Sequence, residues 1–153
     1  MYVRNNKFLT YCTNIHPGES WLETFENLEK YLLNVKNKIN NNEKFSIGLR
    51  LSNQAATELL ENQNIQNFDL WLLKNSCEII TINGFPYGNF HHEKVKENVH
   101  KPDWFSLERK NYTEKIIKII NSLKNTSQEV GISTSPIGYK FSYEQIDLKA
   151  VKK

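Results

Sequence analysis

The sequence predicts an α/β fold in which helices cover a parallel sheet. Short apolar, β-branched segments alternate along the chain with amphipathic helical segments, giving three and a half strand–helix units. The strand segments have apolar residues toward both faces, which is typical of buried parallel strands. The length of 153 residues suits one domain. Two architectures have this pattern, an open doubly wound sheet and a closed parallel (β/α) barrel.

Helix-capping residues mark where the helices of these units are expected to begin. Ser20, followed three residues later by Glu23, forms a capping box that predicts a helix start, and an apolar stripe runs from Trp21 to Ile39. Ser52 or Asn53 is expected to cap a second helical region, and Ser106 a third. The expected strands are 8–14, 45–51, 77–83 and 130–135, and a fourth helix is expected at 143–151.

Polar side chains follow the strands at their carboxyl ends: His16, Arg50, Asn83 and 133–135. In a (β/α) barrel this rim carries the active site. The first strand–helix turn, 13–18, has no glycine-rich phosphate-binding pattern of the dinucleotide-binding type. An open sheet also uses its carboxyl edge. The distribution therefore favours the barrel and leaves the open sheet as the alternative.

Composition narrows the function classes. The net charge is +3 and the isoelectric point is near 8.8, with lysines dispersed over the helices, which argues against nucleic acid as a partner. No apolar stretch reaches membrane-spanning length, and the first residues are not expected to act as a signal peptide. Cys12 and Cys77 lie in apolar strand segments and are expected to be buried free thiols. A reducing, cytoplasmic location is the expectation.

Several residues near the carboxyl rim could carry chemistry. An imidazole ordinarily titrates near neutrality, so His16 could transfer a proton or bind a metal, or it could order its loop. Arg50 ends an apolar strand, where a guanidinium needs either a substrate anion or an internal carboxylate. The long segment 84–105 contains glycines, aromatics and histidines suited to a binding loop. The candidate catalytic residues are His16 and His91, and the candidate substrate-binding residues are Asn14, Arg50, Asn83, Tyr87, Lys94 and Thr134.

Three sequence blocks, in order along the chain, resemble one family. They are LTYCTNIHPGESW at 9–21, IGLRLS at 47–52 and TINGFPYG at 81–88. They resemble the metabolite traffic protein EboE family, which is similar to xylose-isomerase-like, sugar-phosphate isomerase/epimerase barrels of the TIM type. The resemblance implies a metal-assisted isomerase or epimerase for a sugar or related polar metabolite, in a pathway that traffics a small-molecule precursor. It also implies a divalent ion (Mn²⁺, Mg²⁺ or Zn²⁺) whose ligands lie mostly outside this chain.

Such barrels need roughly 250 residues. Residues 1–153 are therefore expected to form the N-terminal half of a single TIM-barrel domain, a fragment. The alternatives to an enzyme are a non-catalytic carrier that binds the metabolite and an inactive truncated half-barrel. A half-barrel exposes two strand edges, so the expected protein partner is a second copy or the missing C-terminal half.

Overall fold

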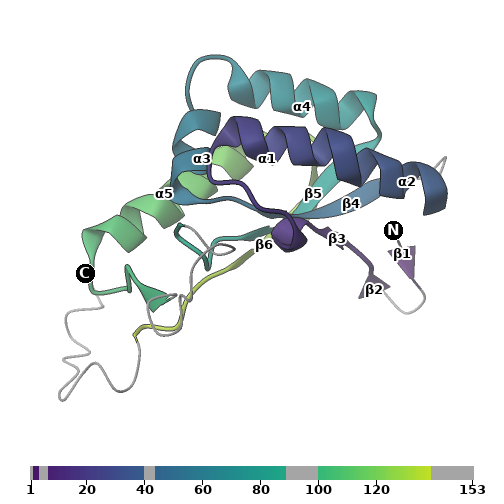
Figure 1. Cartoon of the computed structure of the whole chain (residues 1–153). Coiled ribbons are helices and arrows are strands. Elements are labelled where there is room, and N and C mark those ends of the chain that lie inside the picture. Colours follow the sequence, from purple (N-terminus) through teal and green to yellow (C-terminus); the bar gives the residue numbers. More distant parts are fainter. Residues whose placement is uncertain (1, 4–6, 40–43, 89–99, 139–153) are drawn as a thin grey trace.

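The computed structural model describes residues 2–3, 7–39, 44–88 and 100–138 (Figure 1). Strands and helices alternate along the chain from the first parallel strand onward, which confirms the predicted α/β class. Within the described ranges, no helix is both long and apolar enough to cross a membrane. In chain order the elements are β1 Tyr2–Val3, β2 Lys7–Phe8, β3 Tyr11–Cys12, the 3₁₀ turn η1 Thr13–Ile15, α1 Trp21–Asn27, the π-helical turn η2 Leu28–Leu32, α2 Leu33–Ile39, β4 Phe45–Arg50, α3 Asn53–Leu59, α4 Asn64–Lys74, β5 Cys77–Asn83, α5 Leu107–Ser122 and β6 Thr126–Ser133.

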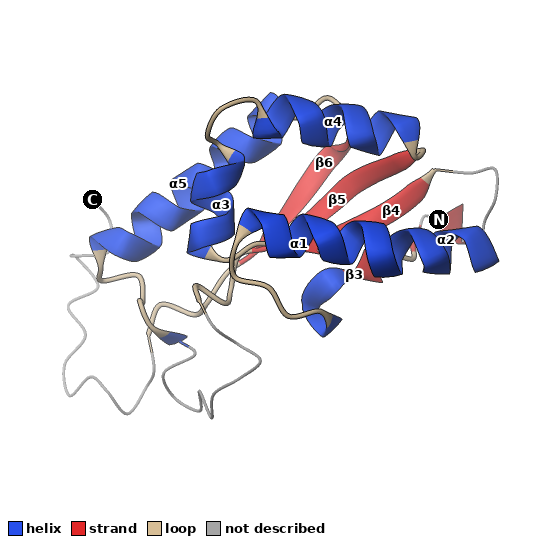
Figure 2. Cartoon of the chain, turned by 45° about the horizontal axis from the view of Figure 1, so that its top comes forward, coloured by secondary structure: helices blue, strands red, loops and turns tan. Residues whose placement is uncertain are grey.

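The main sheet has four strands in the order β3-β4-β5-β6, all parallel, and β1 pairs with β2 in a separate antiparallel hairpin. The labelled helices α1 to α5 lie on one face of this sheet (Figure 2). Closure of the sheet into a barrel stays a prediction. The β5 bounds agree with the predicted 77–83, whereas β3 is short because the chain turns into η1 directly after Cys12.

The face of the sheet toward the helices is apolar. In β4 the residues Phe45, Ile47 and Leu49 are essentially fully buried, and in β5 Ile79 and Ile82 are fully buried. These side chains form one core cluster with the inner surfaces of the helices. Because alternate strand residues point to opposite faces, the remaining residues of the same strands point away from the helices.

That second face is polar, so the prediction of strands apolar on both faces is wrong. A parallel sheet has apolar residues on both faces only when helices cover both sides, and the helices of the described residues cover one. Strand register arranges the second face in three rows across the sheet. From the amino ends to the carboxyl ends, the rows are Ser46 and Glu78; Cys12, Gly48, Thr81 and Gly131; and Arg50, Asn83 and Ser133.

In the middle row, the absence of a side chain at Gly48 lets the Thr81 side chain pack close to β4. A Cβ atom at Gly48 would lie 2.9 Å from Oγ1 of Thr81 and 3.6 Å from Oγ1 of Thr10. The Thr81 side chain therefore occupies the space over Gly48 and packs against the strand next to its own. A β-branched residue at position 48 would have to displace Thr81, which explains the glycine in the middle of a buried strand.

Three helix starts are capped as the sequence predicts. The Ser20 hydroxyl accepts a hydrogen bond from Glu23 N at 3.2 Å, while the Glu23 carboxylate accepts from Ser20 N at 3.0 Å, completing the capping box. Ser52 accepts from Ala55 N at 2.9 Å, and Ser106 accepts from Arg109 N at 3.4 Å. Ser52, rather than Asn53, is thus the cap of α3.

The first helical stripe differs from the predicted one after Leu32. The predicted stripe continues to Ile39, but Ile39 is 57% exposed and Lys36 is buried instead. The cause is η2, because a π-helical turn inserts one residue more than an α-helical turn and shifts the following register. A prediction from sequence periodicity uses a uniform repeat of about 3.6 residues, so it does not detect such an insertion.

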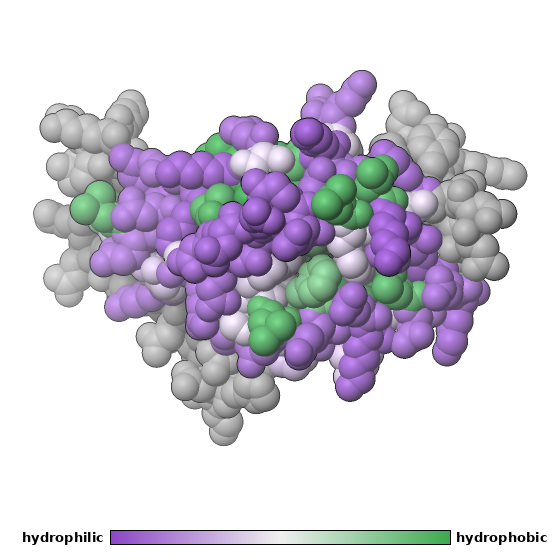
Figure 3. All heavy atoms as spheres, turned by 90° about the horizontal axis from the view of Figure 1, so that it is seen from above, coloured by the Kyte–Doolittle hydropathy of each residue, from purple (hydrophilic) through white to green (hydrophobic). Residues whose placement is uncertain are grey.

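An aromatic cluster fills the space between α1 and α4. Trp21 and Phe68 meet edge to face with ring centroids 4.9 Å apart, and Phe25 contacts Trp71 at 5.5 Å. A hollow of about 390 Å³ lies over this cluster on the outer surface. Figure 3 shows that the helical face around it is mostly hydrophilic, with separate apolar patches. Aromatic side chains of α1 and α4 therefore join these two helices to each other.

The two cysteines have opposite environments. Cys77 is buried, as predicted, whereas Cys12 is exposed, which corrects the prediction of two buried thiols. Cys12 lies on the sheet face that the helices leave uncovered, one residue after Tyr11 on the packed side. The apolar character of segment 8–14 gave no sign of this difference.

Burial of Cys77 predicts a pH dependence of stability. Burial raises the pKa of the Cys77 thiol from its ordinary value of 9.0 to about 11, and the positive charge of Lys36 opposes this shift. The folded chain keeps its proton where the unfolded chain has lost it, so the free energy of unfolding falls as pH rises from 9 to 11. The thiol contributes on the order of 1–2 kcal/mol to this fall. Urea titrations at pH 8, 9.5 and 10.5 measure it.

The matched variants are Cys77→Ala and Cys12→Ala. Cys77→Ala should show a shallower fall with pH, while Cys12→Ala, which removes an exposed thiol and leaves Cys77 in place, should keep the fall that Cys77 causes. Equal pH slopes for the two variants would contradict the assignment. Tyr112, whose pKa burial also raises, contributes equally to both variants and cancels in the comparison.

Candidate functional site at the carboxyl edge of the sheet

The carboxyl-terminal row of the uncovered face brings together three polar residues from neighbouring strands. Arg50 ends β4, Asn83 ends β5 and Ser133 ends β6, and strand register places each beside the next. The Ser133 hydroxyl donates to Asn83 Oδ1 at 2.6 Å, and Phe85 N donates to the same oxygen at 3.1 Å. These contacts fix the orientation of the Asn83 carboxamide through its Oδ1 atom, so its Nδ2 atom can donate to other groups.

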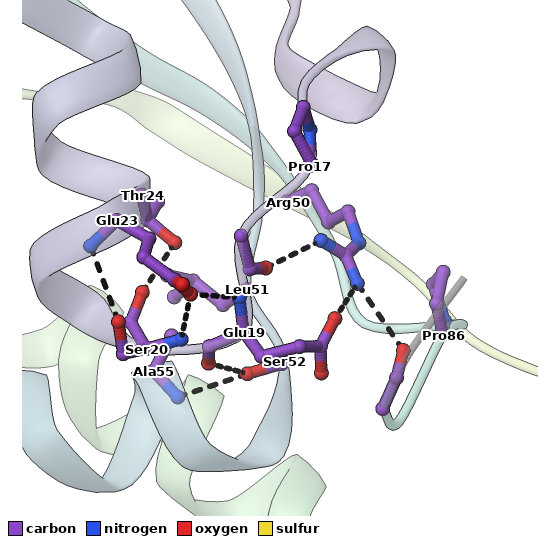
Figure 4. Close-up of polar contacts among 12 residues, drawn as sticks. Pro17, Glu19, Ser20, Glu23, Thr24, Arg50, Leu51, Ser52, Ala55 and Pro86 are labelled. Carbon is purple, nitrogen blue, oxygen red and sulfur yellow. Dashed lines mark hydrogen bonds and ion pairs between the residues drawn. The ribbon is translucent and has the colours of Figure 1, made fainter. Parts of the chain in front are cut away.

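Arg50 is held by the loops that follow β3 and β5. Its Nη2 atom lies 2.7 Å from Oε1 of Glu19 and donates to the Gly88 carbonyl at 3.2 Å, and its Nη1 atom donates to the Gly18 carbonyl at 2.8 Å (Figure 4). The side chain is only 4% exposed. Of the two sequence interpretations, the structure has the internal ion pair, and Arg50 Nε has no partner among the described residues.

Glu19 is a residue that the sequence analysis missed. It precedes the cap residue Ser20, and its backbone carbonyl accepts a hydrogen bond from the Ser52 hydroxyl. The start of α1, the start of α3 and the end of β4 are thereby tied together (Figure 4). The only signal in the sequence was a carboxylate beside a capping box. Such carboxylates usually stabilise the N-terminus of the helix and have no further partner.

His16 lies in an aromatic stack beside the edge strand. Its Nε2 atom is 2.7 Å from the Tyr11 hydroxyl, and its ring stacks on Tyr31 with centroids 4.7 Å apart. Burial raises the pKa of Tyr11. His16 also shares the lining of a water-sized hollow of about 10 Å³ with Arg50 and Thr13. The structure thus brings His16 near Arg50, with its ring held by two tyrosines.

The other candidates are distributed around the same edge. Asn14 lies in η1 with a buried Oδ1 that has no partner among the described residues. Thr134 follows β6 and is exposed. Tyr87 packs beneath the loop, with its ring edge to face with Tyr112 at 5.3 Å and its carbonyl accepting from Asn53 N at 2.8 Å. His91 and Lys94 lie outside the described residues.

Helix α5 fastens both described ends of the long 84–105 segment. Arg109 is fully buried; its Nε donates to the Pro102 carbonyl at 2.7 Å, and its Nη1 donates to the carbonyls of Gly84 and Phe85 at 2.9 and 3.2 Å. Tyr112 donates to the carbonyls of Leu51 and Pro86. Sequence analysis missed this role because Arg109 reads as one more charged position on an exposed helix face.

The environment of Arg109 is unusual for a charged group. Burial lowers its pKa, and Tyr112, Tyr87 and Asp103 act in the opposite direction. The guanidinium carbon lies 5.5 Å from the ring centre of Tyr112 and 5.9 Å from that of Tyr87. Backbone carbonyls and ring faces therefore compensate the buried charge.

The described part of the chain was expected to supply few ligands for a divalent metal. Within it, no group of three or more histidine, cysteine, aspartate or glutamate side chains could hold a metal ion. The residues present at the carboxyl edge offer hydroxyl, carboxamide and guanidinium groups. These groups recognise oxygen-rich ligands by hydrogen bonding.

Comparisons with family models, with curated proteins and with solved structures find no match for this chain.

Proposed function

We propose that the carboxyl edge of the sheet binds a small polyhydroxylated metabolite, a sugar or sugar phosphate, as the substrate of an isomerase- or epimerase-like reaction. The observation that carries the proposal is the row of Arg50, Asn83 and Ser133 on three neighbouring parallel strands. Ligands of open and closed parallel α/β sheets bind outside the carboxyl ends of the strands. The resemblance of three sequence blocks to a family similar to sugar-phosphate isomerase barrels supports the same substrate class.

Each group in the row has a role in this proposal. Asn83 Nδ2 donates to a substrate hydroxyl while Ser133 and Phe85 N hold the carboxamide in place. Arg50 supplies positive charge at the edge, through the guanidinium that also holds Glu19. His16, whose ring nitrogen meets the Tyr11 hydroxyl, is the group suited to move a proton.

A non-catalytic carrier is the second candidate, and the commitment of Arg50 to internal partners favours it. The guanidinium already meets a carboxylate and two carbonyls, as expected of a rigid binding wall. A carrier needs hydrogen-bond donors and shape, without a group that changes protonation during each cycle. Metabolite that binds and is recovered unchanged distinguishes the carrier from the enzyme.

The test is a panel of pentoses, hexoses and their phosphates, each with and without Mn²⁺, followed by calorimetry for binding and by NMR of the sugar for conversion. Asn83→Ala and Ser133→Ala should each weaken binding by about tenfold or more. Thr126→Ala, at the opposite end of β6, is the matched control and should leave affinity unchanged. Binding with conversion supports the enzyme, and binding without conversion supports the carrier. If no member of the panel binds, both are excluded.

A further inference from the structure

We propose that the hollow between α1 and α4 binds a small organic ligand that carries a primary ammonium group beside an apolar body. The inference does not rest on the proposed function, because the hollow is lined by helical residues and shares none with the row of Arg50, Asn83 and Ser133. Its basis is the volume of the hollow, its aromatic floor and the chemistry of its rim. The helical face that carries it is the one seen in Figure 3.

The floor of the hollow is aromatic. The ring centre of Trp21 lies 5.6 Å from that of Phe25 and 4.9 Å from that of Phe68. Phe68 is 1% exposed and Trp21 is 8% exposed, so packing holds the floor in place. The volume of about 390 Å³ lies within the range of small-molecule sites, which is about 300–1,000 Å³. Aromatic rings suit both an apolar ligand body and a cation placed over a ring face.

One wall of the hollow leaves apolar surface in contact with water. Leu22, the residue after Trp21 on α1, belongs to the lining and is 65% exposed. A ligand body that packs between Leu22 and Phe25 would remove this surface from water, which favours binding. The apolar part of the ligand is therefore assigned to the α1 side of the hollow.

The opposite rim accepts hydrogen bonds and carries negative charge. It consists of Glu58, Glu61, Asn64 and Asn67, from the end of α3 and the first turns of α4. The two carboxylates give the lining a formal charge of −2, and none of the lining residues is basic, in a chain whose net charge is +3. Because ionised carboxylates accept hydrogen bonds and cannot donate them, the complementary ligand group is a cationic donor.

Internal contacts orient this rim and leave acceptors available. Glu58 Oε2 accepts from Trp21 N at 2.6 Å and Glu58 Oε1 from Gln54 Nε2 at 2.8 Å, and each carboxylate oxygen has a second lone pair. Asn64 Nδ2 donates to the Glu58 carbonyl at 2.8 Å, so the Asn64 Oδ1 atom can accept. Within the described ranges, the Glu61 side chain has no hydrogen bond or ion pair. A primary ammonium, with three N–H donors, matches several acceptors at once.

The test uses three probes that share one ring and differ in charge: phenethylamine, which is protonated at pH 7, neutral 2-phenylethanol and anionic 3-phenylpropionate. Each is titrated into the whole chain to about 10 mM, since ligands of this size bind in the millimolar range. NMR follows the Leu22 methyl groups and the Trp21 indole. Phenethylamine should shift both in a saturable way and bind about fivefold more tightly than 2-phenylethanol, with 3-phenylpropionate the weakest. The Trp104 indole, which donates to the Ser135 carbonyl outside the hollow, should not shift.

Two variants separate the charge from the apolar contact. Glu61→Gln removes one rim charge at an exposed position, so it should weaken phenethylamine binding by about threefold to fivefold and leave 2-phenylethanol binding unchanged. Leu22→Ala, read out at Trp21, should weaken the amine and the alcohol by the same factor. Glu108→Gln removes an equal charge from an exposed position on α5 and should change neither affinity. Since all three positions are exposed, the circular dichroism spectra should be unchanged.

Four results would overturn the proposal. Equal affinity of the three probes would mean that the hollow does not select a cation. Shifts that do not saturate, or that Glu61→Gln leaves unchanged, would mean a general attraction of cations to the surface. The absence of any shift with all three probes would mean that no small amine binds there. Saturable shifts with only an amphipathic peptide of leucine and lysine would assign the hollow to a protein partner.

Discussion

Replacing Arg109 with methionine is expected to lower the free energy of unfolding by about 3–5 kcal/mol. The buried guanidinium donates to three backbone carbonyls, from Gly84, Phe85 and Pro102. Methionine fills part of the volume but leaves these carbonyls without a donor, and each unsatisfied buried acceptor costs about 1–3 kcal/mol. Urea denaturation followed by circular dichroism measures the loss. The slope with denaturant should be unchanged if the native fold persists.

The neighbouring residue provides a close control. Lys110 is exposed, and its ammonium lies 3.9 Å from Glu114 one helical turn away. Lys110→Met removes the same charge from the same helix and should change stability by less than about 0.5 kcal/mol. Arg109→Lys should recover only part of the loss, because one ammonium cannot reproduce the two donor nitrogens that reach the two ends of the segment. Equal stability of Arg109→Met and Lys110→Met would refute the role assigned to Arg109.

Replacing Arg50 with methionine is expected to cost about 2–4 kcal/mol, the second largest effect. The substitution removes the partner of Glu19 and the donors to the Gly18 and Gly88 carbonyls. Glu19 is 31% exposed and can be rehydrated, so the loss should be smaller than at Arg109. Glu19→Gln should cost about 1–2 kcal/mol, since it keeps an oxygen that can accept from Arg50.

A double-mutant cycle isolates the pair. The combined Arg50→Met and Glu19→Gln variant should be more stable than the sum of the single losses predicts, with a coupling energy of about 1–2 kcal/mol. The pair of Lys110 and Glu114, 3.9 Å apart and exposed at both side chains, is the comparison and should couple by less than about 1 kcal/mol. Additive losses for Arg50 and Glu19 would mean that the carbonyl contacts, rather than the ion pair, hold Arg50.

Local signals in the sequence predicted local structure well. The capping box at Ser20 and Glu23 needs only four residues, so it can be read directly. The segment 77–83 is bounded by turn residues on both sides and became β5 with those bounds. The alternation of strands with helices fixes the parallel sheet, because a parallel connection needs a crossover segment.

Features that depend on distant neighbours could not be predicted. Whether Cys12 is buried depends on which face of the sheet the helices cover, and Cys12 itself does not encode that choice. The acceptors of Arg109 are backbone carbonyls as far as 25 residues away, which no side-chain pattern marks. At the site, the sequence placed Arg50 and Asn83 at strand ends. It left open which faces they share, because a register change of one residue reverses every strand side chain.

The order of the strands in the sheet has a consequence for how the chain reaches this structure. Each of β4, β5 and β6 pairs with the strand that precedes it in the chain, so each new unit docks on one already made. A chain emerging from the ribosome at about 5–20 residues per second has ample time to form each unit before the next is synthesised. Helices α1 and α3 contact each other, and both are synthesised before α4. During synthesis, the strand made last lies at one edge of the sheet, and the next strand to be made pairs with it.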